Sequence, residues 1–421
     1  MTWLSSLQRL AAERDRTGLR RRLRPRAEED GLVDLAGNDY LGLARHPDVV
    51  AAATAALKGY GLGATASRLV RGSTYVHGQI EAALAELLGC EAALVYSSGY
   101  LANLGAVRAV DWPLIASDAH NHASLVDGCR LARAGRTVVY GHGDPSALDQ
   151  ALAPAGPGAL PQGARSARAG PGAFEASPSL VAPVASLPTL LSPGEAGTGA
   201  WPALAVTESV FSVHGDLAPL PDLHRIARRR GAVLLVDDAH AVGVLGPGGA
   251  GAVVAAGIAG EPDVIVTATL SKALGAAGGV VAGPRALVHH LVETSRSFIY
   301  DTGLPPSVAA GVLAALDLVR GEAGQRAREE LTDRAADAWR RLDEAGLRIA
   351  RPAAGVLSVH APGPDAALAW AEACRARDVA VGCFRPPSTP DGESRLRLTI
   401  NVGVPRSDFD RALDVIVATA P

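Results

Sequence analysis

The stretch VLLVDDAHAVGVLG, residues Val233 to Gly246, joins an apolar run of strand length to two aspartates and a histidine. A short, continuous apolar run is typical of a strand that is buried on both faces of a parallel sheet. Asp237 ends the run, and a carboxylate at a buried strand end needs a cationic partner or several hydrogen-bond donors. The stretch therefore predicts a covered sheet with a charged site at the carboxyl ends of its strands, where ligands bind in open α/β sheets.

Six further apolar runs of strand length alternate with amphipathic helical segments. Together with Val233–Val236, the predicted strands are Ala92–Tyr96, Leu114–Ala116, Thr137–Tyr140, Leu204–Thr207, Val264–Ala268 and Gly279–Ala282. This alternation predicts an α/β fold whose large domain has a mostly parallel, seven-stranded sheet with helices on its faces.

The pattern also divides the chain into segments. Residues 1–37 begin with helical periodicity, residues 38–300 hold the seven strand-like runs, and residues 301–421 begin with two long helices. Further strands are expected in this last segment, which we interpret as a smaller α+β C-terminal domain: Val356–His360, Ala380–Phe384 and Leu396–Ile400. Residues 154–202 form an Ala/Pro/Gly/Ser tract that cannot bury enough apolar area to offset its ordering entropy, so we expect a disordered insertion there.

Composition excludes several classes of function. The 40 Lys+Arg nearly balance the 43 Asp+Glu, giving a formal net charge of −3, so no general electrostatic case for nucleic acid exists. Apolar runs are of strand length and the N-terminus is charged every few residues, so neither a membrane span nor a signal peptide is expected. The four cysteines lack CxxC spacing and are expected to be reduced thiols of a cytoplasmic protein: Cys90, Cys129, Cys374 and Cys383.

Lysine is rare in this chain, and its position is therefore informative. Of the 40 Lys+Arg only Lys58 and Lys272 are lysines. Lys272 follows the predicted strand Val264–Ala268, which places it at the carboxyl edge of the sheet. An amine can condense with a carbonyl, which a guanidinium cannot do, so Lys272 is a candidate for covalent chemistry.

Other candidate groups follow neighbouring predicted strands. The amides of Gly99 and Tyr100 open a helix after Ala92–Tyr96 and form a potential anion site. His120 and His122 follow the strand near residue 115, and Ser212 follows Leu204–Thr207.

Asp237 and His240 form a D-x-x-H pair that can also ligate zinc or iron. No further cluster of matching spacing accompanies this pair, so we expect no metal and favour an organic cofactor. An amine, a carboxylate and anion-binding amides together match the needs of pyridoxal 5′-phosphate (PLP), whose protonated ring nitrogen requires a carboxylate.

The sequence resembles the α-oxoamine synthase family of fold-type-I PLP-dependent transferases. The resemblance covers nearly the whole chain outside residues 154–202, and the motifs that carry it are GNDYLGL, SSGYLANLGAV, HNHASLVDG, TESVFSVHGD, VDDAHAVGVLG, TLSKALG, FIYDTGLPP and RPPSTPDGESRLRLT.

The resemblance implies a set of cofactor-binding roles. Lys272 matches the lysine that forms the Schiff base, Asp237 the partner of the ring nitrogen, and His240 the donor to the cofactor's phenolic oxygen. His122 matches the imidazole stacked on the ring, which leaves His120 as a bystander. Ser212 matches a further cofactor contact, and Gly99, Tyr100 and Thr269 match ligands of the phosphate. Thr302 matches a residue that reaches the phosphate of the partner subunit's cofactor, which implies a homodimer with shared sites.

The resemblance also implies substrate contacts. Arg397 matches the arginine that pairs with the amino acid's carboxylate, whereas its neighbour Arg395 is interpreted as a surface charge. Asn38 matches a position near that carboxylate, and Arg20 a position near the acyl donor. Ser388 stands where the family usually has threonine, and Ala241 and Val242 fill a pocket that is usually lined by smaller residues.

The branch of the family that serves biotin synthesis is the best match, because RPPS rather than a Tyr-Pro pair precedes RLR. It implies condensation of L-alanine with a pimeloyl thioester of CoA or of an acyl carrier protein. The alternatives are glycine-using or long-acyl members of the family. A generic aminotransferase fits the full motif set less well, and a catalytically silent subunit is disfavoured by the intact Lys272.

Overall fold

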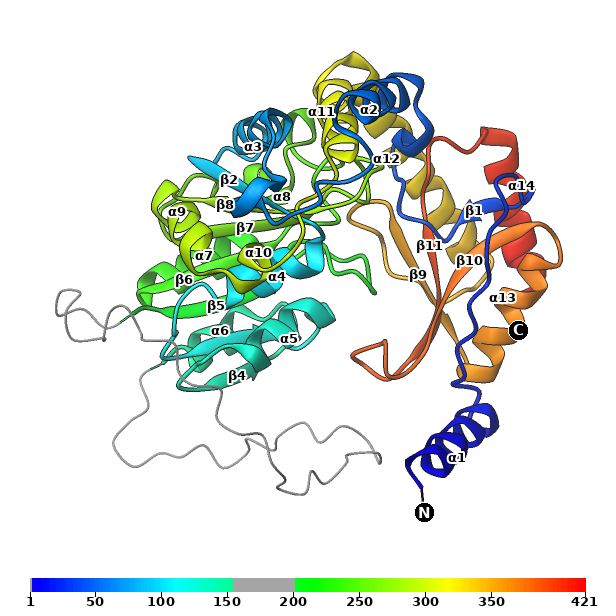
Figure 1. The fold of residues 1–421 in the computed structure, drawn as a ribbon. Helices are drawn as coiled ribbons and strands as arrows, with labels where there is room; N and C mark the ends of the chain where they lie inside the picture. Colours follow the sequence, from blue (N-terminus) through cyan, green and yellow to red (C-terminus); the bar gives the residue numbers. More distant parts are fainter. Residues whose placement is uncertain (1, 154–200) are drawn as a thin grey trace.

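A computed structural model describes residues 2–153 and 201–421 and contains the expected seven-stranded sheet (Figure 1). Its strand order is β2-β8-β7-β6-β5-β3-β4, and all neighbouring strands are parallel except that β8 runs antiparallel to β2 and β7. The bounds are β2 (Ala92–Tyr96), β3 (Ile115–Asp118), β4 (Thr137–Tyr140), β5 (Ala203–Glu208), β6 (Ala232–Asp237), β7 (Val264–Thr269) and β8 (Gly279–Gly283). The prediction of a mostly parallel sheet is confirmed.

Both faces of the large sheet are covered, which explains why its strands are continuously apolar. In β2, Val95 packs in the core that contains Ile80 of α3, whereas Leu94 packs in the core that contains Ala102 of α4. Alternate residues of a strand point to opposite faces, so a strand with a core on each side has no room for exposed polar side chains. The helices of this part of the chain are α2 (Pro47–Tyr60), α3 (Tyr75–Leu87), α4 (Gly99–Val107), α5 (Ala123–Leu131), α6 (Pro145–Ala151), α7 (Leu220–Arg229), α8 (Ala252–Ala255), α9 (Arg285–Thr294), α10 (Arg296–Ile299) and α11 (Pro306–Arg320).

A second, smaller sheet has the order β1-β10-β11-β9. Its strands are β1 (Val33–Leu35), β9 (Val356–Ala361), β10 (Val379–Phe384) and β11 (Ser394–Thr399), and the helices around it are α12 (Glu322–Glu344), α13 (Pro364–Arg375) and α14 (Arg406–Ala418). The last predicted strand begins and ends too late, since β11 starts at Ser394 and ends at Thr399.

The N-terminal segment contributes to this second sheet. Helix α1 (Trp3–Arg16) is followed by an extended stretch whose strand β1 pairs in parallel with β10. Only three residues form β1, which is too few for a periodic signal, and the sequence therefore did not reveal it. Helix α11 packs against α2 and α3, so the border between the two domains is crossed by helical contacts near residue 305.

The predicted disordered insertion, residues 154–202, lies outside the described residues except for Trp201 and Pro202. In the described part of the chain, no helix is both long and apolar enough to cross a bilayer. All four cysteines are free thiols. The cytoplasmic location that they led us to expect stays a prediction.

Candidate active site

Lys272 lies in the turn after β7, and its side chain reaches the turn after β6. Lys272 Nζ is 2.8 Å from His240 Nε2, and His240 Nδ1 is 2.5 Å from the hydroxyl of Tyr40. Burial lowers the pKa of Lys272 to about 8 and lowers that of His240 well below its usual value. A lysine with a lowered pKa supplies the neutral amine that condenses with an aldehyde.

Asp237 ends β6 and is held by a buried polar network. Asn103 of α4 donates from Nδ2 to Asp237 Oδ2 at 2.7 Å and to Ser124 Oγ at 2.8 Å. The hydroxyl of Thr267 of β7 donates to Asn103 Oδ1 at 2.6 Å, which fixes the orientation of the side-chain amide. The Ala239 N–H donates to Asp237 Oδ1 at 3.0 Å. These donors stabilise a carboxylate that is only 6% exposed.

His122 is connected to the same network. It caps the N-terminus of α5, where its Nδ1 accepts the backbone N–H of Ser124 at 3.2 Å and lies 2.7 Å from the Ser124 hydroxyl. Because Nδ1 is an acceptor here, the proton of the neutral ring is on Nε2. Burial lowers the pKa of His122, which favours that neutral ring.

Glu208 is a buried acid that reasoning from the sequence missed. It ends β5 directly beside Asp237, and the two residues are partners in the strand register. Burial, and then the charge of Asp237, raise the pKa of Glu208 to about 8. The backbone N–H of Ser212 donates to Glu208 Oε2 at 3.0 Å, which is the contact that the structure gives for the predicted Ser212. A glutamate at the end of an apolar strand next to a second acid was the available signal.

The start of α4 presents the backbone donors that the sequence predicted to bind an anion. Ser98 caps the helix by accepting the Leu101 N–H at 3.2 Å, and the N–H groups of Gly99 and Tyr100 open it. Thr269 lies against Gly99 so closely that a Cβ at position 99 would be 2.9 Å from the Thr269 Cβ. The Tyr100 side chain turns away and donates to Asp127 at 2.5 Å. Glycine at 99 therefore allows Thr269 to lie directly beside the backbone donors at the start of α4.

Arg397 of β11 is the group that the small domain contributes. It is 5% exposed, its Nη2 donates to Asn38 Oδ1 at 3.0 Å, and its Nε has no hydrogen-bond partner among the described residues. Its charge contributes to the lowered pKa values of Lys272 and His240. A buried guanidinium with a free N–H fits a carboxylate of a small ligand.

Arg395 contradicts its interpretation as a surface charge. It is 1% exposed, pairs with Asp391 and donates from Nη1 to Ser358 Oγ of β9 at 3.2 Å. Every residue of β11 is buried, so both of its faces are covered, which the alternation of charged and apolar residues alone did not indicate.

Three predicted residues do not meet the others in this structure. Arg20 is exposed and pairs with Asp15. Ser388 accepts a hydrogen bond at 2.5 Å from Arg21, which belongs with Arg20 to the arginine run, residues 20–26. Thr302 is exposed in the segment between α10 and α11. Among the described residues, none of the three hydrogen-bonds to Lys272, Asp237 or His240.

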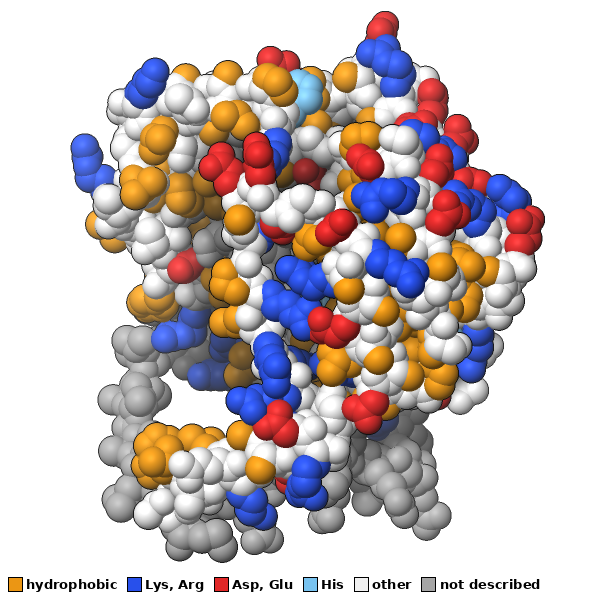
Figure 2. Space-filling model, turned by 90° about the vertical axis from the view of Figure 1, so that its right-hand side faces the viewer, with side chains coloured by type: hydrophobic (Ala, Val, Ile, Leu, Met, Phe, Trp, Pro, Cys, Tyr) orange, Lys and Arg blue, Asp and Glu red, His pale blue; other side chains and the backbone are white. Residues whose placement is uncertain are grey.

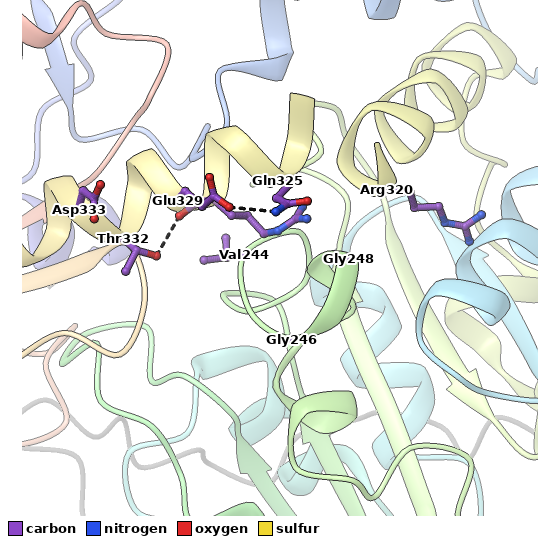
Figure 3. A pocket seen from close by; sticks show the side chains of 9 residues that line it. Val244, Gly246, Gly248, Arg320, Gln325, Glu329, Thr332 and Asp333 are labelled. Carbon is purple, nitrogen blue, oxygen red and sulfur yellow. Dashed lines mark hydrogen bonds between the residues drawn. The ribbon is translucent and has the colours of Figure 1, made fainter. Parts of the chain in front are cut away.

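A cavity of about 820 Å³ lies apart from these residues. Figure 3 shows it between α12 and the turn formed by residues 244–249, with Gln325, Glu329 and Thr332 on the helix side. Neither Lys272 nor Asp237 lines it, so this cavity is not the candidate active site. Within the described ranges, no group of three or more His, Cys, Asp or Glu is arranged to hold a metal ion. The groups around Lys272 fit PLP in kind: an amine, a carboxylate, an imidazole and the backbone N–H groups at the start of α4.

Comparisons with known proteins agree with this fit. The model of the aminotransferase class I and II family matches residues 30–416. An 8-amino-7-oxononanoate synthase from Mycobacterium sp. (strain JLS) is 45% identical, covering 98% of this chain and 96% of its own. Another from Mycolicibacterium smegmatis is 46% identical and covers 100% and 97%. A solved serine palmitoyltransferase variant from S. paucimobilis with bound PLP is 26% identical, with a TM-score of 0.80 over 100% of this chain and 98% of that one.

Proposed function

Because the chain belongs to the aminotransferase class I and II family, and within it to the 8-amino-7-oxononanoate synthases, we propose that it condenses L-alanine with a pimeloyl thioester. Carbon dioxide and the free thiol are released, and the product serves biotin synthesis. The observation that carries the chemistry is the 2.8 Å contact between Lys272 Nζ and His240 Nε2 beside the buried Asp237.

PLP is the cofactor of this family, and when bound it supplies an aldehyde for an amine and an electron sink for charge at the amino acid's α-carbon. We assign Lys272 to the aldehyde and Asp237, held by Asn103, to the ring nitrogen. The amides of Gly99 and Tyr100, with the hydroxyl of Thr269, are assigned to the phosphate. His240 is assigned to the ring oxygen, and Ser212 to a further contact with the cofactor.

Lys272 and His122, whose pKa values burial lowers, are assigned to the steps at the substrate. Lys272, with its pKa near 8, takes the proton from the α-carbon of alanine. His122 carries its proton on Nε2, and its neutral ring is assigned to donate a hydrogen bond from Nε2 to the enolate that forms when carbon dioxide leaves. Arg397 binds the carboxylate of alanine through its free Nε and its Nη2, with Asn38 orienting the guanidinium.

The acyl donor is assigned to the face that the N-terminal segment crosses. Figure 2 shows Lys and Arg side chains gathered on this face. The arginine run of residues 20–26 contributes five exposed side chains: Arg20, Arg21, Arg22, Arg24 and Arg26. Arg21 contacts Ser388, and Arg385 donates to the carbonyl of Gly18, so the run lies beside the β10–β11 connection. Arg20 and Ser388 are proposed to flank the thioester of CoA or of an acyl carrier protein, both of which are anionic.

We further propose a homodimer with shared sites. Apolar side chains are strongly exposed near the segment that carries Thr302: Leu62 is 84% exposed, Val70 81% and Tyr75 89%. The Gly303 N–H donates to the Ala66 carbonyl at 3.0 Å, which ties the two segments together. A patch of this kind is typical of an interface. A second copy of the chain that covers it would bring Thr302 of the first copy to the phosphate site of the second.

Borohydride reduction of the PLP-loaded protein followed by peptide mass spectrometry tests the covalent assignment. We expect a pyridoxyl group on Lys272 and none on Lys58, which is exposed on α2 and offers a matched control. Lys272→Ala should lose the label and turnover, whereas Lys58→Ala should keep both. A label on Lys58 alone, or an undiminished label in Lys272→Ala, would contradict the assignment.

A second assay separates the members of the family. The loaded protein is given L-alanine with pimeloyl-CoA, or glycine with the same donor, and carbon dioxide and free thiol are measured. Products with alanine support the proposal, whereas products with glycine alone would move the chain to the glycine-using branch.

A further inference from the structure

Three histidines that the proposed reaction does not use lie ring on ring beside the candidate site. The ring centroids of His120 and His142 are 3.9 Å apart with an interplanar angle of 21°, and those of His120 and His214 are 4.7 Å apart with an angle of 17°. His120 follows β3, His142 follows β4 and His214 lies in the loop after β5. This histidine stack therefore joins three strand ends of the large domain.

The inner end of the stack is held firmly. His142 Nδ1 is 3.1 Å from Asp118 Oδ1, and its Nε2 is 2.8 Å from Asp216 Oδ2. Although burial opposes the charge, these two carboxylates raise the pKa of His142 to about 9. Asp118 also accepts the backbone N–H of His120 at 2.8 Å. Burial, and then the neighbouring rings, lower the pKa of His120 to about 4, so a neutral ring packs against both neighbours, whose own ring centroids are 5.8 Å apart.

The outer end of the stack reaches the small domain. His214 Nε2 lies 3.0 Å from Asp391 Oδ2, in the connection between β10 and β11. Asp391 also pairs with the buried Arg395, which is anchored to Ser358 of β9. Asp391 therefore lies between a histidine of one domain and an arginine of the other sheet, and we call the His214–Asp391 pair the interdomain clasp.

The two sides of the clasp adjoin two site residues that come from different domains. His120, which stacks on His214, is two residues before His122 in the same turn. Arg395, which pairs with Asp391, is two residues before Arg397 on β11, and side chains two apart on a strand point to the same face. The loop of His214 makes a further contact with the small domain, since the Ala353 N–H donates to the Gly215 carbonyl at 2.9 Å.

We propose that the interdomain clasp is a positioning device, which holds Arg397 of the small domain in register with Lys272, His240 and His122 of the large domain. The proposal rests on the proposed function in one respect, the assignment of Arg397 to the amino acid's carboxylate. Neither His214 nor Asp391 is assigned a contact with that substrate. They act through the rigid segments to which they are attached.

Two variants break the clasp from either side, and a third is a matched control. His214→Gln and Asp391→Asn remove the contact between imidazole and carboxylate with little change in volume. His224→Gln removes a similar pair within the large domain, where His224 Nε2 is 3.1 Å from Asp263 Oδ1. Backbone hydrogen exchange of residues 385–393 and calorimetric affinity for L-alanine are measured on the PLP-loaded protein without an acyl donor. Turnover is measured separately at saturating alanine.

We expect both clasp variants to exchange faster in residues 385–393 and to bind L-alanine at least about fivefold more weakly, with a smaller change in kcat. His224→Gln should match the parent in both measurements. The proposal is overturned if Asp391→Asn keeps the parent's affinity, whether or not its exchange rises, or if His224→Gln weakens binding equally. A parent that binds no amino acid would instead overturn the proposed function, and the exchange data would still decide whether the clasp holds the connection in place.

Discussion

Asn103 is the residue whose replacement tests the buried network most directly. Its side chain is 3% exposed and makes three hydrogen bonds, to Asp237 at 2.7 Å, to Ser124 at 2.8 Å and from Thr267 at 2.6 Å. Asn103→Ala removes all three and leaves two hydroxyls and a carboxylate oxygen in an environment that water does not reach. The substitution should therefore destabilise the fold and also disturb the orientation of Asp237.

The expected loss follows from the kinds of bond removed. A hydrogen bond to a charged group is worth roughly 1.5–3 kcal/mol and a neutral one about 1 kcal/mol, so the three together amount to about 4 kcal/mol. Asn121 offers a matched control, because its buried amide donates only to neutral groups, Ser117 Oγ at 2.9 Å and the Val206 carbonyl at 3.0 Å. Asn121→Ala should cost about 2 kcal/mol by the same reasoning. The difference of about 2 kcal/mol is the part that depends on the carboxylate.

The assay is urea denaturation of the cofactor-free protein at one fixed concentration. The shift of the midpoint multiplied by the slope m gives the change in the free energy of unfolding. PLP affinity is then titrated for each variant and should fall for Asn103→Ala more than for Asn121→Ala. Equal losses of stability in the two variants, together with equal PLP affinity, would refute the argument that Asn103 holds Asp237.

Two further predictions concern the anion site and the second buried acid. Gly99→Ala should weaken PLP binding by about tenfold or more, because the added Cβ would lie 2.9 Å from the Thr269 Cβ. Gly59→Ala on α2, where no atom lies within 4 Å of the added Cβ, should keep the parent's affinity. Equal affinity of the two variants in a PLP titration would contradict the prediction. Glu208 has a pKa raised from 4.5 to about 8, so the folded chain keeps a proton that the unfolded chain releases, and stability is lost as the pH rises between those values. Glu208→Gln lacks this loss, so its unfolding free energy relative to the parent should rise from about pH 5 to about pH 9, by at most about 5 kcal/mol. A flat or falling difference in denaturation midpoints would argue against a neutral Glu208.

The sequence by itself determined the large sheet and the residues at its edge. Continuous apolar runs such as Val233–Val236 predict strands covered on both faces, and the seven predicted strands match β2 to β8 within two residues at each end. Lys272, Asp237 and His240 follow such strands directly, so their place at one edge follows from local order along the chain. The resemblance then supplied their roles.

The tertiary structure alone decided what surrounds those residues. Asn103 and Tyr40 carry no local signal, because their importance arises from partners that are distant in sequence and meet only when strands and helices pack. Glu208 ends an apolar strand, but only the packed sheet places it beside Asp237. Arg395 was misread for the same reason: a charged residue in a strand is exposed or buried according to what packs on its face, and here the side chain is buried and paired with Asp391. Strand periodicity is a property of neighbouring residues, whereas burial and pairing are properties of the whole packed chain.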